Sequence, residues 1–148
     1  MIKLYSPYCF FFSLIILISL NSCAQAPKNP NLEGAENTIY KQGLLYYNVV
    51  CSSCHLKDGT GLNKLYPPLS GSDYLSTHRG ELACIIKNGM NQEIQVNGIK
   101  YDQEMPANPR LSVIDITNIL NYVYTSWDND LPITTIDQTK KDLDKCLD

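Results

Sequence analysis

Cys51-Ser52-Ser53-Cys54-His55, in a chain of 148 residues, is the stretch that decides the fold. In a helical turn the two thiols lie three positions apart on one face, so both can bond to one flat group. The neighbouring His55 offers an imidazole, which is a suitable iron ligand in its neutral form. The spacing is typical of covalent haem attachment, in which each cysteine forms a thioether with one vinyl group of the porphyrin.

Two other chemistries use closely spaced cysteines. A thioredoxin-like redox pair is expected beside a βαβ pattern, which this chain lacks. A zinc site needs a second ligand pair at a similar spacing, whereas His78, Cys84 and Cys146 stand far apart. Haem attachment is therefore the preferred interpretation.

A helical pattern precedes the motif. It begins near Ala35 and carries Gly43 and Tyr47, which stand eight and four residues before Cys51. We expect this helix to deliver the chain directly to the cysteines.

A second helical pattern follows much later, from Val113 to Ser126. Ser112 and Asp115 form a capping-box-like start for it. Between the two lie one or two predicted helices within residues 72–88 and a hairpin-like stretch from Glu93 to Tyr101, whose Asn97-Gly98 predicts a tight turn.

These features together resemble the class I cytochrome c family from Ala35 to Trp127. Gly43 and Tyr47 match the glycine and the aromatic residue at which the family's first helix crosses its last, and only glycine allows so close a crossing. Tyr122 or Val123 is expected to meet Gly43. The resemblance implies a small all-α domain around one covalently bound haem c, with a minor β-hairpin.

The loop after the motif, residues 57–69, is rich in apolar residues and looks like the family's haem-covering loop. By that similarity the Pro67 carbonyl accepts a hydrogen bond from the free ring nitrogen of His55, which fixes the ring and raises its basicity. Pro68 is the alternative acceptor. A plain surface turn stiffened by prolines is the other interpretation.

The resemblance assigns the sixth iron ligand to Met105, because a Met-Pro pair stands between the predicted turn and the final helix. A thioether is a soft ligand that favours ferrous iron and raises the reduction potential. Met90 and His78 are the alternatives. The apolar wall around the haem is expected from nine residues: Leu62, Leu69, Leu75, Ile85, Ile86, Ile94, Val96, Tyr101 and Ile119.

A histidine and a methionine that fill both axial positions imply a one-electron carrier and not an enzyme. The expected partners are a redox protein donor and acceptor, such as a respiratory oxidase or a dehydrogenase. Two alternatives stay open: a cytochrome subunit of a larger oxidoreductase, and a haem enzyme or ligand sensor with an open sixth position.

The charge balance argues against a nucleic-acid partner. The chain has 12 Lys and Arg against 15 Asp and Glu, and loss of residues 1–22 would remove only one lysine. No basic cluster dense enough for phosphate binding remains.

The N-terminus predicts export. Lys3 precedes a short uncharged apolar run, so residues 1–22 are interpreted as a signal peptide; the run is short for an uncleaved transmembrane anchor. Leu20-Asn21-Ser22-Cys23 resembles a bacterial lipobox, which makes Cys23 a lipidation site and residues 23–34 a tether for a domain over residues 35–148. The expected location is a membrane-anchored lipoprotein facing the periplasm or cell surface. Ordinary cleavage with a free Cys23 is the alternative.

Cys84 and Cys146 are left over once Cys9 leaves with the leader and the other cysteines are assigned. Exported proteins keep disulfides, so we expect these two to pair and to hold a C-terminal helix within residues 135–147 against the helix around Cys84. Two separately buried free thiols are the alternative.

Overall fold

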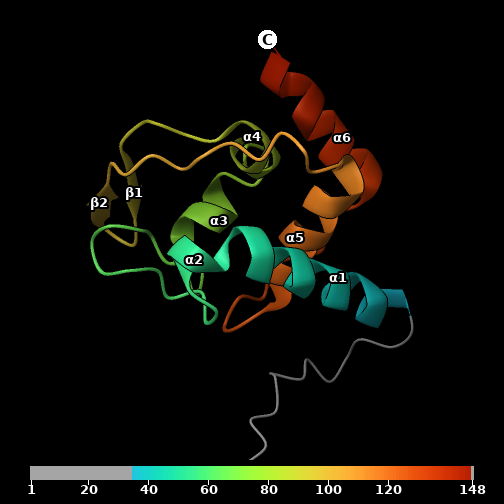
Figure 1. Ribbon diagram of the computed structural model, residues 1–148, viewed down its shortest axis with the longest axis horizontal. Helices are drawn as coiled ribbons and strands as arrows, with labels where there is room; N and C mark the ends of the chain where they lie inside the picture. The colour runs from blue at the N-terminus through green and yellow to red at the C-terminus, as the bar shows by residue number, and fades with distance from the viewer. Residues whose placement is uncertain (1–34, 148) are drawn as a thin grey trace, which may run out of the picture.

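The computed structural model describes residues 35–147. The described elements are α1 (Ala35–Val50), α2 (Ser52–His55), α3 (Asp73–Thr77), α4 (Leu82–Asn88), β1 (Ile94–Val96), β2 (Ile99–Tyr101), α5 (Val113–Thr125), α6 (Ile136–Asp144) and the 3₁₀ turn η2 (Lys145–Leu147), arranged as Figure 1 shows. The expectation of an all-α domain with a small hairpin is confirmed.

The predicted signal peptide (1–22), the lipidation site Cys23 and the tether (23–34) lie outside the described residues. Within residues 35–147, no helix is long and apolar enough to cross a membrane.

The two longest helices, α1 and α5, cross at Gly43. A Cβ added to Gly43 would collide with the backbone oxygen of Asn118 and lie 2.6 Å from the Cβ of Tyr122. The expected contact with Tyr122 is therefore confirmed, and the absence of a side chain is what permits it. One turn later Tyr47 is fully buried, with its ring centroid 5.1 Å from that of Tyr122.

A capping box begins α5, as the sequence predicts. The Ser112 hydroxyl accepts a hydrogen bond from the Asp115 N–H (3.2 Å), and the Asp115 carboxylate accepts one from the Ser112 N–H (2.9 Å). These bonds satisfy two donors that a helix N-terminus leaves free. Most of α5 beyond its first turn is buried, because α1, α4 and α6 all pack on it.

The hairpin is held to α3 by its own turn. β1 and β2 pair antiparallel, and Asn97 and Gly98 between them both have positive φ (51° and 80°), as a tight two-residue turn requires. The Asn97 amide donates to the Gly71 carbonyl (3.1 Å) and accepts from the Asp73 N–H (3.1 Å). The turn therefore fixes where β1 lies relative to α3.

The C-terminal helix α6 packs against α4 and α5 (Figure 1). The Thr135 hydroxyl caps it by accepting a hydrogen bond from the Gln138 N–H (3.1 Å). Of its apolar residues, Leu143 packs against the core, whereas Ile136, the first residue of the helix, is 49% exposed.

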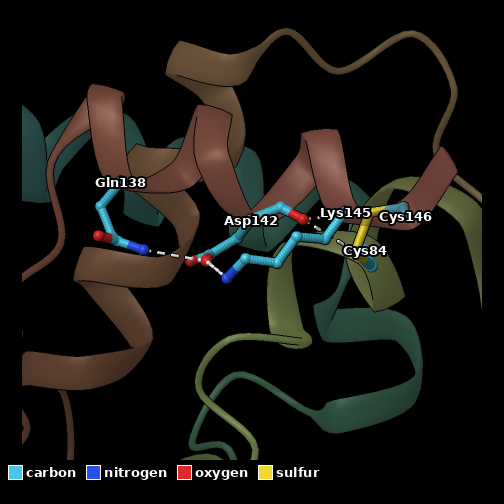
Figure 2. Close-up of a disulfide and its surroundings, with 5 residues drawn as sticks. All are labelled: Cys84, Gln138, Asp142, Lys145 and Cys146. Carbon is cyan, nitrogen blue, oxygen red and sulfur yellow. Dashed lines mark hydrogen bonds and ion pairs between the residues drawn. A yellow bond between two sulfur atoms is a disulfide. The ribbon is translucent and has the colours of Figure 1, made fainter. Parts of the chain in front are cut away.

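A disulfide joins Cys84 of α4 to Cys146 of η2, with the two Cα atoms 5.7 Å apart (Figure 2). Asp142 lies beside it, nearly buried. Its carboxylate accepts hydrogen bonds from the Gln138 amide (2.9 Å) and from the Lys145 ammonium (3.0 Å), as Figure 2 shows. The covalent link holds the tail against α4, whereas these hydrogen bonds lie within the tail and order its last turns.

Replacing both Cys84 and Cys146 by serine tests this link. The two cysteines stand 62 residues apart, and a loop of this size contributes about 4 kcal/mol in the chain-entropy model. We expect a loss of that order in the free energy of unfolding, measured by denaturant titration of the haem-loaded protein. The parent protein in dithiothreitol should show the same loss. Peptide mapping without reductant that recovers both cysteines as alkylated thiols would contradict the link.

Candidate functional site

The turn after α1 places Cys51, Cys54 and His55 together. The Cys51 carbonyl accepts hydrogen bonds from the N–H groups of Cys54 (3.2 Å) and His55 (3.0 Å). The turn ends at Leu56, which has a positive φ of 62°. The buried Tyr47 hydroxyl donates to the Leu56 carbonyl at 2.6 Å and so secures this bend. The α1–α5 crossing thereby fixes the cysteine motif.

Two neighbouring cavities open beside the motif. The larger contains about 680 Å³ of empty space, including its open mouth, and Cys51 and His55 line it. The smaller contains about 440 Å³, and Cys54 and His55 line it. The two share five lining residues: His55, Pro67, Met90, Ile94 and Met105. We refer to the two together as the site cavity.

The walls of the larger cavity are apolar. Side chains from α3, α4, β1, α5 and the preceding loop form them: Leu69, Leu75, Leu82, Ile85, Ile86, Ile94, Val96, Ile119, Leu120 and Val123. A cavity whose walls carry so few polar groups suits a large apolar ligand. Thiols, an imidazole and thioethers at its edge are donors that hold haem and its iron. The residues present therefore fit a haem.

The expectation that Leu62 belongs to this apolar wall is wrong. It lines neither described cavity and is 40% exposed. A short antiparallel bridge pairs Leu62 with Tyr66, so the loop folds back on itself and Leu62 lies at its outer edge. Tyr66 lines the smaller cavity, as Tyr101 does.

The imidazole of His55 is held in one orientation by the loop. Its Nδ1 lies 3.0 Å from the Pro67 carbonyl oxygen. A carbonyl only accepts, so Nδ1 carries the proton and Nε2 keeps its lone pair. Burial lowers the pKa of His55, and the bond to Pro67 offsets part of this effect. Both the tautomer and the neutral state suit an imidazole that binds a metal.

Gly61 allows the Pro67 carbonyl to reach the ring. Its φ is +69°, and a Cβ added there would collide with the Tyr66 carbonyl oxygen and lie 2.7 Å from that of Pro67. No side chain can therefore occupy this position without displacing the acceptor of the His55 hydrogen bond.

Asn129, which follows α5, also supports the loop, although no sequence pattern indicated this role. Its amide donates to the Leu69 carbonyl (2.9 Å) and to the Val123 carbonyl (2.8 Å), and it accepts from the Gly71 N–H (2.9 Å). The end of the loop is thus tied to the end of α5.

Met105 and Met90 lie opposite each other. The Met105 N–H donates to the Met90 carbonyl (2.8 Å), and the Met90 N–H donates to the Met105 carbonyl (2.9 Å). Paired residues of antiparallel chains direct their side chains to the same side, and both methionines line both parts of the site cavity. The structure therefore brings two thioethers to the site.

The other alternative ligand, His78, lies elsewhere. Its ring stacks on that of Tyr74 with centroids 3.8 Å apart, and its Nδ1 lies 2.8 Å from the Thr77 hydroxyl oxygen. It lines neither of the two parts of the site cavity.

The structure supports neither of the two alternatives for Cys51 and Cys54, a thioredoxin-like redox pair or a zinc site. Burial, with a smaller effect of Cys54, raises the pKa of Cys51 to about 12, whereas a reactive redox pair needs a lowered pKa. Within residues 35–147, no group of three or more His, Cys, Asp or Glu side chains could hold a metal ion, as a zinc site would require.

Comparison with known proteins gives a family match. The family model described as cytochrome c matches residues 40–127. Cytochrome c-552 of Thermus thermophilus is 31% identical over 81 residues, which are 52% of this chain and 62% of that protein. The cytochrome c subunit of quinone alcohol dehydrogenase from Gluconacetobacter polyoxogenes is 30% identical over 118 residues, which are 77% of this chain and 25% of that subunit.

Replacing Gly61 by alanine tests how the loop holds His55. We expect the added methyl group to displace the Pro67 carbonyl and to weaken its bond to the ring, at a cost of about 1 kcal/mol or more in the free energy of unfolding. Gly71→Ala is the matched control, since Gly71 also has a positive φ (+60°) but nothing within 4 Å of an added Cβ. The NMR signal of the His55 Nδ1 proton should broaden or shift only in Gly61→Ala. Equal effects of the two changes would show that backbone strain alone is responsible.

Proposed function

The chain belongs to the cytochrome c family, and from this premise we propose that it is an electron carrier that holds its covalently bound haem c through Cys51 and Cys54, with His55 and Met105 as axial ligands. When bound, the haem supplies an iron that takes up and releases one electron. The chain itself acts as carrier and not as enzyme in this proposal.

One observation carries the proposal: an oriented imidazole and a thioether line the same cavity. The chain can thus fill both axial positions and leave none for a substrate. Pro67 keeps the imidazole in its binding tautomer, and the soft thioether favours the reduced metal. The apolar walls exclude water, which supports a raised reduction potential.

The second candidate function is that of a cytochrome subunit fixed within a larger oxidoreductase. The match to the cytochrome c subunit of quinone alcohol dehydrogenase extends over 77% of this chain, which favours a dehydrogenase as electron donor. A haem enzyme or sensor is less favoured, because it needs an open sixth position.

The location is part of the proposal. A signal peptide over residues 1–22 and a lipidated Cys23 would place the domain of residues 35–148 at a membrane surface, outside the cytoplasm. An exported location also agrees with a disulfide between Cys84 and Cys146.

Mass spectrometry tests covalent attachment. The mature protein, denatured and extracted with acidified acetone, should retain the mass of one haem because two thioethers hold it. Cys51→Ala or Cys54→Ala should leave one thioether at most, and the double variant none. A parent protein that loses its haem in this treatment would overturn the assignment.

Replacing Met105 by alanine tests the sixth ligand. We expect a lower reduction potential and loss of the red absorbance band that depends on iron–methionine bonding, because the soft ligand is removed. Met90→Ala is the matched control, since Met90 lines the same cavity, and should change neither property. Carbon monoxide should bind to the reduced Met105→Ala protein and not to the parent. Exchanged results would identify Met90 as the ligand.

A further inference from the structure

The segment from Met105 to Leu111 connects the hairpin to α5 and carries the proposed methionine ligand. Apart from the bridge at Met105, none of these residues belongs to a helix or strand. Its position must therefore come from bonds to neighbouring elements. Those bonds decide where the Met105 side chain lies.

The last turn of α4 supplies these bonds through Lys87. Its ammonium donates to the carbonyl of Pro109 (2.8 Å) and to that of Leu111 (2.7 Å). Leu111 is itself buried in the core. Hydrogen bonds with a charged donor are stronger than those between neutral groups.

Asn108, which belongs to the segment after Met105, donates hydrogen bonds to α4. Its N–H donates to the Lys87 carbonyl (3.1 Å), and its side-chain amide donates to the Ile86 carbonyl (3.2 Å). These bonds also satisfy carbonyls that the C-terminus of a helix leaves free. Side chains from both partners therefore join α4 to the segment.

Gly89 brings the two backbones close where the methionines pair. Its φ is +76°, and a Cβ there would lie 2.5 Å from the Met105 carbonyl oxygen and 2.8 Å from the Ala107 nitrogen. This close approach is followed directly by the paired hydrogen bonds of Met90 and Met105. We call Lys87, Asn108 and this methionine pair the methionine clamp.

The hydrogen bonds of the Lys87 ammonium are not those of a lysine that caps its own helix. A lysine that only complements the helix dipole would bond the last carbonyls of α4. Within residues 35–147, both hydrogen bonds that the Lys87 Nζ makes go instead to the segment after Met105. None of the ion pairs in that part of the chain includes Lys87. Its charge is thus directed at backbone carbonyls.

We propose that Lys87 and Asn108 are positioning residues that hold the Met105 sulfur at the site. The inference rests on the proposed function, in which Met105 is an axial ligand. A methionine side chain is flexible, so a Met105 sulfur that is to stay beside a bound haem iron would need a backbone that does not open locally. The clamp lowers the population of that open state.

The α4 side of the clamp is fixed by the rest of the fold. Leu82 and Ala83 are buried in the core, and Cys84, three residues before Lys87, is bonded to Cys146. Opening therefore moves the segment away from α4, and α4 stays in place.

Lys87→Met in the haem-loaded protein removes the ammonium and keeps an apolar stem. We expect the equilibrium for loss of the methionine-dependent absorbance band, followed as the pH of the oxidised protein is raised, to shift at least tenfold toward loss. The reduction potential should fall as well. Lys87→Arg should keep both the band equilibrium and the reduction potential near their parent values, because a guanidinium also donates to carbonyls.

Lys100→Met is the matched control. Lys100 is also paired, with Glu93 at 2.8 Å, but its side chain is 72% exposed in the hairpin. The Lys100→Met variant should leave the band equilibrium and the reduction potential unchanged. Asn108→Ala should shift the band equilibrium and the potential in the same direction as Lys87→Met. If Lys87→Met does not load haem, Asn108→Ala serves as the test variant in its place.

A purely structural role for the clamp predicts a different result. Lys87→Met and Asn108→Ala would then lower stability in denaturant but leave the band equilibrium and the potential at parent values, which would overturn the proposal. A band that survives Met105→Ala would instead overturn the ligand assignment, so the two failures are distinguishable.

Discussion

The contact of Gly43 with the backbone of Asn118 and with Tyr122 is the constraint on which the other parts depend. It sets the distance between α1 and α5, so that Tyr47 is buried and its hydroxyl can hold Leu56. The cysteine motif lies between these last two residues in sequence, and its place relative to α5 follows. Because α5 also supplies part of the cavity wall, one close crossing positions both the attachment residues and the surface that faces them.

Much of the fold was predictable because its signals are local. The helix before Cys51, the capping box of α5 and the Asn97-Gly98 turn each depend on residues within a few positions of one another. The family resemblance also rests partly on a local signal, because the crossing glycine, Gly43, stands eight residues before Cys51. The structure also brings the predicted site residues His55, Pro67 and Met105 to one cavity, which no local pattern could have indicated without the resemblance.

The supports of the site were not predictable, because they join residues far apart in sequence through ordinary polar side chains. Asn129 bonds to Leu69 and Gly71, and Lys87 to Pro109 and Leu111. An asparagine or a lysine in a loop or at a helix end is usually exposed, so its type carries no signal of such a role. Leu62 shows the opposite error: an apolar residue near the motif suggested a wall, but the bridge to Tyr66 leaves it at the surface.

The tail beyond the family match belongs to the same packed unit as the site. Asn121 of α5 is buried, and both polar atoms of its side chain are satisfied by the backbone of Thr134, at 3.0 and 2.7 Å. Arg79 lies 4.4 Å above the Tyr124 ring and donates to the Pro132 carbonyl. Without the tail these α5 side chains would lose their partners or their cover. Their immediate neighbours Leu120 and Val123 line the site cavity, so the helix that the tail covers on one side forms the cavity wall on the other. Packing of the tail therefore stabilises the α5 side of that wall, just as its disulfide to α4 anchors the elements beside Met105.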